Sequence, residues 1–227
     1  MSLHSDGPTT TFLQCALSMP PFLVQYNESA ATRLFESLRV GHDLKSLAFQ
    51  DSGVTFSGPR ATIEIAPGKT LRFSRTIRDG AGTELLVREM QDALAQVLAA
   101  LSVPFLVAPQ IVLRASWSCV DQHSHDYLLD LTQLHSRLKV DSLGERVSLG
   151  IRLIVQSRGA EQQGPEIFDV KIEPLFREPH DLYLEVVATF PAKIITKNVD
   201  ELGHMIERTY DEYRKVQTLL KESERNG

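Results

Sequence analysis

One loop in the second half of the chain gathers several potential metal ligands. His123, His125 and Asp126 lie within four positions, and Cys119 and Asp121 come shortly before them. Imidazole and carboxylate groups are good ligands for zinc and similar ions. A metal-dependent hydrolase with His123, His125 and Asp126 as ligands is therefore one hypothesis for this chain.

The residues that follow argue for a simpler interpretation of this loop. The hydrolase pattern of this type continues with a second Asp and a His, but here Tyr127 and Leu128 come next. A polar loop between a strand and a helix, with His125 or Asp126 near the helix start, explains the same residues. We keep the metal site as an alternative and expect no cofactor.

Gly68-Lys69-Thr70 has the ending of a phosphate-binding P-loop. That loop needs a further glycine five residues earlier, where this chain has Ile63, and it must lead into a helix. The residues after Thr70 alternate like a strand, and Pro67-Gly68 suits a type II turn. The segment therefore predicts a β-hairpin.

Cationic residues recur on or near the predicted strands: Arg72, Arg75, Arg78, Arg114, Arg152, Lys171 and Arg177. If several share one exposed sheet face, they could bind a phosphate, a carboxylate or an acidic protein segment. We select Arg72, Arg114, Arg152 and Lys171 as candidate binding residues. The alternative is a solvated sheet surface on which the cations pair with Glu64, Asp169, Glu173 and Glu185.

The sequence contains no nucleophile elbow, HExxH motif, dinucleotide fingerprint or Cys-x-x-Cys pair. Catalytic groups can also converge from scattered positions, so an enzyme is disfavoured and the question stays open. The net charge of −5 argues against nucleic acid, because such proteins usually carry a basic surplus. We expect a protein partner or a small anionic ligand.

Composition indicates an ordinary globular protein, with 227 residues, 42% of them hydrophobic and 23% charged. Cys15 and Cys119 both fall in apolar strand-like runs, which fits buried intracellular thiols better than a disulfide scaffold. No apolar run approaches the roughly 20 residues of a membrane span, and no secretory signal is visible. The expectation is a cytoplasmic protein that does not enter a membrane.

The periodicity of apolar residues predicts alternating groups of strands and helices. Strands are expected at 11–18, 46–50, 54–57, 61–65, 70–77, 111–120, 146–156, 167–176 and 182–190. Helices are expected at 27–38, 83–101 and 126–139, and a long one begins after Asn198, where Glu201 could close a capping box. Asn27 is the expected N-cap of the first helix.

The second half of the chain resembles the first, displaced by about 100 residues. Each half reads strand, short helix, three or four strands, long helix. Within the aligned stretch, six pairs are identical: Leu13/Leu113, Ser18/Ser118, Thr32/Thr132, Leu34/Leu134, Leu38/Leu138 and Val40/Val140. We interpret this as an internal duplication.

The predicted fold is α+β: an internally duplicated β-α-β-β-β(-β)-α unit that forms an antiparallel sheet with helices packed on one face. The expected divisions are a flexible N-terminus at 1–10, a first repeat at 11–105, a second repeat at 106–222 and a flexible tail at 223–227. The other sheet face would be at least partly open.

This order of elements is similar to the duplicated saddle of the TATA-binding protein superfamily. The resemblance implies a concave sheet face that grips a ligand. Those proteins insert phenylalanines into the minor groove of DNA, whereas alternation here places Phe73 and Phe190 on the side facing the helices. No DNA-contacting residue is therefore carried over.

The second half also resembles a sporadically distributed bacterial family of uncharacterised proteins. The residues that carry this resemblance are Leu113-Arg114 and the ending from Phe168-Asp169-Val170 to Val199-Asp200-Glu201-Leu202-Gly203-His204. The family has no established activity, so the resemblance implies little about function.

The sequence thus favours a non-catalytic binding or interaction module. It would use its open sheet face, or the groove between the two repeats, to hold a protein segment or a small anionic ligand. Nucleic-acid binding through a TATA-binding-like saddle is the first alternative, and the metal-dependent hydrolase is the second. The narrow apolar stripe of the last helix would also suit a homodimer.

Overall fold

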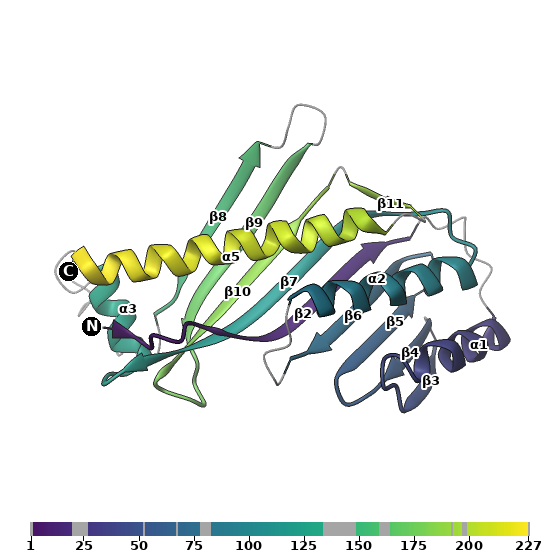
Figure 1. Cartoon of the computed structure of the whole chain (residues 1–227), viewed down its shortest axis with the longest axis horizontal. Helices are drawn as coiled ribbons and strands as arrows, with labels where there is room; N and C mark the ends of the chain where they lie inside the picture. The colour runs from purple at the N-terminus through teal and green to yellow at the C-terminus, as the bar shows by residue number, and fades with distance from the viewer. Residues whose placement is uncertain are drawn as a thin grey trace.

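A computed structural model of the whole chain shows one antiparallel sheet with helices on one of its faces (Figure 1). The structure describes residues 2–19, 27–51, 53–66, 68–77, 83–133, 149–158, 164–191, 193–196 and 199–226. The predicted α+β class and antiparallel sheet are confirmed.

The first half of the chain supplies one side of the sheet and two helices. Asn27 accepts a hydrogen bond from the Ala30 backbone N–H at 2.8 Å, which starts α1 at the predicted N-cap. The elements are β1 (Ser2–Leu3), β2 (Thr9–Ser18), α1 (Glu28–Arg39), β3 (Ser46–Gln50), β4 (Gly53–Ser57), β5 (Ala61–Ala66), β6 (Thr70–Thr76) and α2 (Thr83–Ala100).

The second half supplies the other side of the sheet. Its elements are β7 (Phe105–Val120), α3 (Ser124–Thr132), β8 (Ile151–Arg158), β9 (Pro165–Pro174), β10 (Asp181–Thr189), β11 (Ile194–Thr196) and α5 (Asp200–Asn226). The predicted cap at Asn198, the end of the helix predicted at 126–139 and the start of the strand predicted at 146–156 lie outside the described residues.

The strand order is β3-β4-β5-β6-β2-β7-β10-β9-β8, and every pairing along it is antiparallel. In each half the first strand pairs with the last long strand, β2 with β6 and β7 with β10. The two halves then meet through β2 and β7 at the centre. The strand orders of the two halves therefore correspond about the centre of the sheet. Common descent of the two halves stays a prediction.

The core lies between the sheet and its helices. Figure 1 shows α1, α2 and α5 on the same face, with α2 over the first-half strands and α5 along the second half. The predicted stripe of α5 faces this core, because Leu202, Ile206, Tyr213, Val216 and Leu220 are all buried. Burying such a stripe is the main source of helix stability in a protein of this kind.

The two long helices approach each other closely at Gly203. A Cβ atom at this position would lie 2.9 Å from Gln91 Nε2 and 3.3 Å from Val87 Cγ1. Gln91 Nε2 also donates a hydrogen bond to the Val199 carbonyl oxygen at 3.2 Å. The absence of a side chain at Gly203 thus lets α2 and α5 pack in contact, so that both cover one sheet.

Part of the N-terminal segment pairs with the end of β7. Residues 1–10 were predicted to be flexible, but Ser2–Leu3 pair with the end of β7 and Leu3 is buried. Trp117 Nε1 also donates a hydrogen bond to the His4 carbonyl oxygen at 3.0 Å. At the other end, α5 continues through residues 223–226 of the predicted flexible tail.

None of the described helices combines the length and the apolar character that crossing a membrane requires.

Candidate functional site: the open sheet face

Side chains alternate between two faces along each strand, and the described helices cover only one of them. On β7, for example, Leu113, Ala115 and Trp117 point to the core, while Arg114 and Ser116 are half-buried on the opposite face. We call this second face the open face. All four candidate binding residues, Arg72, Arg114, Arg152 and Lys171, alternate onto it.

Strand register places most of these candidates in one line. Phe12 of β2 lies opposite Arg114, Arg114 opposite Glu185, Glu185 opposite Lys171, and Lys171 opposite Arg152. We call Phe12, Arg114, Glu185, Lys171 and Arg152 the Arg114 row. The row crosses five strands, including the central pair, so it runs over the middle of the sheet.

Glu185 is the anchor of the Arg114 row. Its carboxylate accepts hydrogen bonds from Arg114 Nε at 2.8 Å, from the Tyr183 hydroxyl at 2.8 Å and from Lys171 Nζ at 3.0 Å. The residue is only 7% exposed. A carboxylate with so little access to water needs several donors, and here three strands supply them.

These contacts fix the charge states of the network. Burial opposes ionisation of Glu185, but the bonds from Arg114, Tyr183 and Lys171 outweigh it and lower its pKa. Burial and the bond to Glu185 raise the pKa of Tyr183, so its hydroxyl stays protonated. Although burial opposes it, the bond to Glu185 raises the pKa of Arg114.

Arg114 is held between an acid and an aromatic ring. Its guanidinium carbon lies 4.8 Å from the centre of the Phe12 ring, while its Nε atom donates to Glu185. The side chain keeps 43% of its exposure. Phe12 was not among the residues selected from the sequence. The geometry leaves an oriented, partly exposed cation at the middle of the open face.

Arg152 ends the Arg114 row at the edge of the sheet. Its Nε and Nη2 atoms bind the two carboxylate oxygens of Asp169 at 2.8 and 2.6 Å. These bonds lower the pKa of Asp169 and raise that of Arg152. With 60% of its side chain exposed, Arg152 forms a surface ion pair of the kind that contributes little stability.

Arg72 does not belong to the Arg114 row. It lies opposite Ala16 on β2, four residues along the strand from Phe12, or about 13 Å. Its Nη1 atom binds Glu64 Oε2 at 2.7 Å. The structure therefore brings Arg114, Lys171 and Arg152 together and separates Arg72 from them.

The cations of the open face are matched by acids. Three of the four carboxylates that the sequence suggested as partners, Glu64, Asp169 and Glu185, bind these cations. Arg75 alternates to the helix side and pairs with Glu89 of α2 at 3.0 Å. Arg177 is exposed in the turn after β9, and Arg78 lies outside the described residues.

The histidine loop is organised by packing. The His123 ring stacks on His180 with 4.7 Å between centres, and His180 Nδ1 lies 2.8 Å from the Gln122 carbonyl oxygen. His123 occupies the N-cap position of α3 without a side-chain cap. Within the described part of the chain, no three His, Cys, Asp or Glu side chains are placed to hold a metal ion.

A cleft of about 570 Å³ is lined by residues of α2 and α5. Its lining is mostly charged and comes from both helices: Glu84, Val87, Arg88, Gln91, Glu207, Asp211 and Arg214. The cleft is wide and open to water. Arg214 and Asp211 form an ion pair at 2.9 Å, but both belong to α5, so this pair does not link the two helices.

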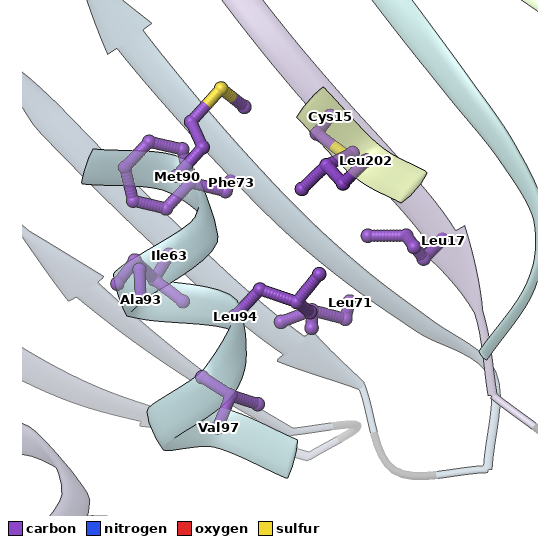
Figure 2. Close-up of a pocket in the computed structure, with 10 residues that line it drawn as sticks. All are labelled: Cys15, Leu17, Ile63, Leu71, Phe73, Met90, Ala93, Leu94, Val97 and Leu202. Atoms are coloured by element: carbon purple, nitrogen blue, oxygen red, sulfur yellow. The ribbon is translucent and has the colours of Figure 1, made fainter. Parts of the chain in front are cut away.

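A small apolar cavity lies under α2, as Figure 2 shows. Met90, Ala93, Leu94 and Val97 of α2 point toward the strands there, and Cys15 faces Leu202 of α5. Its volume of about 10 Å³ is at the lower limit for one water molecule, and its lining offers no polar partner. Burial raises the pKa of the Cys15 thiol, which makes it unreactive.

No protein-family model matches the chain, and no curated protein matches its sequence.

The site contains two residues that the sequence did not indicate, Phe12 and Tyr183. Alternation alone could have placed Tyr183 on the same face as Glu185, because they are two residues apart on one strand. Phe12 required knowledge of the β2–β7 register, which has an irregularity between Thr10 and Phe12. No local pattern predicts that irregularity.

Proposed function

We propose that this protein is a non-catalytic binding protein whose open sheet face holds a segment of a partner protein. The observation that carries the proposal is the central group of Phe12, Arg114 and Tyr183: Glu185 binds Arg114 and Tyr183, and Arg114 lies over the Phe12 ring. Arginine and tyrosine are enriched among residues that dominate the binding energy of protein interfaces. They are most effective near the centre of a surface, which is where they lie here.

Rigidity supports this role. Glu185 binds Arg114, Lys171 and the Tyr183 hydroxyl at the same time. Side chains that are already ordered lose less conformational entropy when a partner binds. A partner segment could therefore pack on the Phe12 ring and accept hydrogen bonds from Arg114 without reorganising the sheet.

Charge balance favours a protein segment over nucleic acid. Arg72, Arg152 and Arg114 each pair with a carboxylate on the same face, and Lys171 shares Glu185. A polyanion would have to compete with these carboxylates, and its binding comes mainly from neutralised phosphates. A protein segment with its own polar and apolar groups matches a mixed surface better.

The charge states of the network also favour binding over proton transfer. A general acid or base works best when its pKa lies near the working pH. Here the pKa of Glu185 is lowered and that of Tyr183 is raised, so both move away from neutral pH. The network is suited to holding fixed charges and donors.

The test is recovery of a partner by the tagged full chain from its own host, followed by variants. We expect one defined partner to bind the natural chain and to be lost with Arg114→Gln and Arg152→Glu. Arg33→Glu is the matched control, because Arg33 is exposed on α1, away from the open face. Circular dichroism confirms that each variant is folded.

Partner binding that is the same for both open-face variants and for the control would disprove this use of the face. A second measurement separates the nucleic-acid alternative. DNA and RNA are titrated with the chain at about 50 mM salt and again at higher salt, because phosphate binding falls steeply as salt rises. Tight binding of DNA or RNA that weakens as salt rises would contradict the proposal and favour the nucleic-acid alternative.

A further inference from the structure

Strand β8 forms one edge of the sheet. It pairs with β9 along its whole length, and no described strand pairs with its other side. An edge strand presents a row of backbone N–H and C=O groups that can pair with another strand. The outer side of β8 is thus a place where the sheet could continue.

The side chains of β8 are unusually exposed for such an apolar strand. Leu153 is 37% exposed, Ile154 67% and Val155 38%. On the adjacent strand β9, Val170 lies opposite Leu153 and Phe168 lies opposite Val155, and both are fully buried. Helix α5 packs on β7 and β10, and α3 packs on β7 and β9, so the described helices leave β8 largely uncovered.

Two of the usual protections of an edge strand, a proline and a β-bulge, are absent from β8. It contains no proline, and its pairing with β9 runs from residue 151 to 158 without a bulge. Arg152, the second residue of the strand, is bound to Asp169 on its own sheet. Three consecutive exposed apolar residues on an unprotected edge are expected to find a partner.

We propose that β8 pairs with β8 of a second copy of this chain, antiparallel and about a two-fold axis through Ile154. Directly opposite residues in an antiparallel pair share a face. In this register Ile154 meets its own copy, Leu153 meets Val155, and Arg152 meets Gln156. Each of the three exposed apolar residues of β8 in one copy then contacts an apolar residue of the other copy.

The neighbouring symmetric registers fit less well. A pairing centred on Val155 places Ile154 opposite Gln156 and Leu153 opposite Ser157, so two apolar residues face polar ones. A pairing centred on Leu153 places Arg152 opposite Ile154. A shift of the register by one residue would place residues of the core-side face opposite residues of the open face. This self-complementarity is why a second copy, and not an unrelated strand, is the occupant.

The pairing has a consequence for the open face. A two-fold axis perpendicular to the sheet keeps the open faces of both copies on the same side. The two Arg114 rows would then lie on one continuous surface, with their Arg152 ends on opposite sides of the axis. The dimer does not depend on the proposed function, and it differs from the dimer through the last helix that the sequence suggested.

The first test is the mass of the full chain in solution, by light scattering at tens of micromolar. The expected mass is twice the chain mass of 25.4 kDa. Ile154→Lys places two ammonium groups face to face at the axis and is expected to give the 25.4 kDa monomer. The matched control is Phe176→Lys, because Phe176 is 75% exposed in the turn after β9, and this variant is expected to remain a dimer.

The second test addresses the register. Residues that face each other across an antiparallel pair have Cβ atoms about 5 Å apart, close enough for a disulfide after small adjustment. Ile154→Cys should therefore crosslink to its own copy when an added oxidant removes two electrons from the two thiols. Phe176→Cys should not. The native cysteines, Cys15 and Cys119, are buried and do not interfere.

Two results would overturn the proposal. One is a natural chain that is monomeric at this concentration. The other is a dimer that survives Ile154→Lys, since it would have to form through another surface. Because Ile154 is 67% exposed, the variant is expected to fold, and circular dichroism verifies this. A dimer without the Ile154→Cys crosslink would refute the register centred on Ile154.

Discussion

Leu13 and Leu113 lie directly opposite each other in the central β2–β7 ladder, and neither is exposed to solvent. The pairs on either side are reciprocal: Phe12 faces Arg114, and Gln14 faces Val112. Exchanging the halves by a displacement of about 100 residues converts one of these pairs into the other. Leu13 and Leu113 therefore mark the centre about which the strand orders of the two halves correspond.

This central pair is expected to carry much of the stability of the sheet. Leu13→Ala and Leu113→Ala should each lower the free energy of unfolding by about 2–5 kcal/mol, because each leaves a cavity in a closed core. The loss of unfolding free energy in the double variant should differ from the sum of the two single losses, since the two residues are in contact. Urea unfolding followed by the single tryptophan, Trp117, measures this. Val40→Ala, at an 85% exposed position, is the control that should change little.

Local pattern predicted most elements of this fold. Two strands and two helices lie within a residue or two of their predicted bounds, because alternation, caps and turn residues are local signals. They are the strands at 46–50 and 61–66 and the helices α1 and α2. The two shortest strands, Ser2–Leu3 and Ile194–Thr196, were not predicted. Each is defined by pairing with β7, which is distant in sequence, so two or three residues carry no signal of their own.

The candidate site could be predicted only in part. Alternation allowed Arg114, Lys171 and Arg152 to share one face, and two of the four suggested acids, Glu185 and Asp169, pair with them. It could not show that these three form one row while Arg72 lies apart. That distinction depends on the register between strands, which follows from side-chain packing across the whole sheet.

The buried acid of the Arg114 row should make stability depend on pH in the acidic range. Glu185 has a lowered pKa in the folded chain, so the stability it contributes is present above its ordinary pKa of 4.5 and is lost as pH falls below it. At neutral pH, Glu185→Gln should lower the free energy of unfolding by about 1–3 kcal/mol. Urea unfolding at a series of pH values should show this difference shrinking toward low pH.

The matched control for Glu185→Gln is Glu178→Gln, because Glu178 is exposed in the turn before β10. This change should have little effect at any pH. A difference between the natural chain and Glu185→Gln that stays constant down to strongly acidic pH would contradict the role assigned to the carboxylate.

Gly58, directly after β4, is expected to be hard to replace. A Cβ atom there would lie 2.2 Å from the Asp43 carbonyl oxygen, so the backbone at Asp43 and Leu44 would have to move to admit it. Gly58→Ala should lower the free energy of unfolding by about 1–3 kcal/mol or more. Gly41→Ala is the control, because no atom lies within 4 Å of its Cβ position. Equal unfolding midpoints for the two variants would show that the backbone at Asp43 does not lie this close to Gly58.

His42 should make the chain less stable at mildly acidic pH. The ring is 2% exposed and lies edge-on to Phe73, with its Nε2 atom 3.5 Å from Asp92 Oδ2 and the Arg75–Glu89 pair nearby.

Burial lowers the His42 pKa, and Arg75 acts in the same direction, although the carboxylates of Asp92 and Glu89 oppose them. The unfolded chain therefore takes up a proton at the ordinary value of 6.5 while the folded chain resists it, so stability falls as pH drops below that value. Urea unfolding at about pH 7.5 and pH 5.5 should show this loss in the natural chain and in His204→Gln, whose ring is exposed. His42→Gln should lose much less over the same range, and an equal loss in all three proteins would rule out His42 as its source.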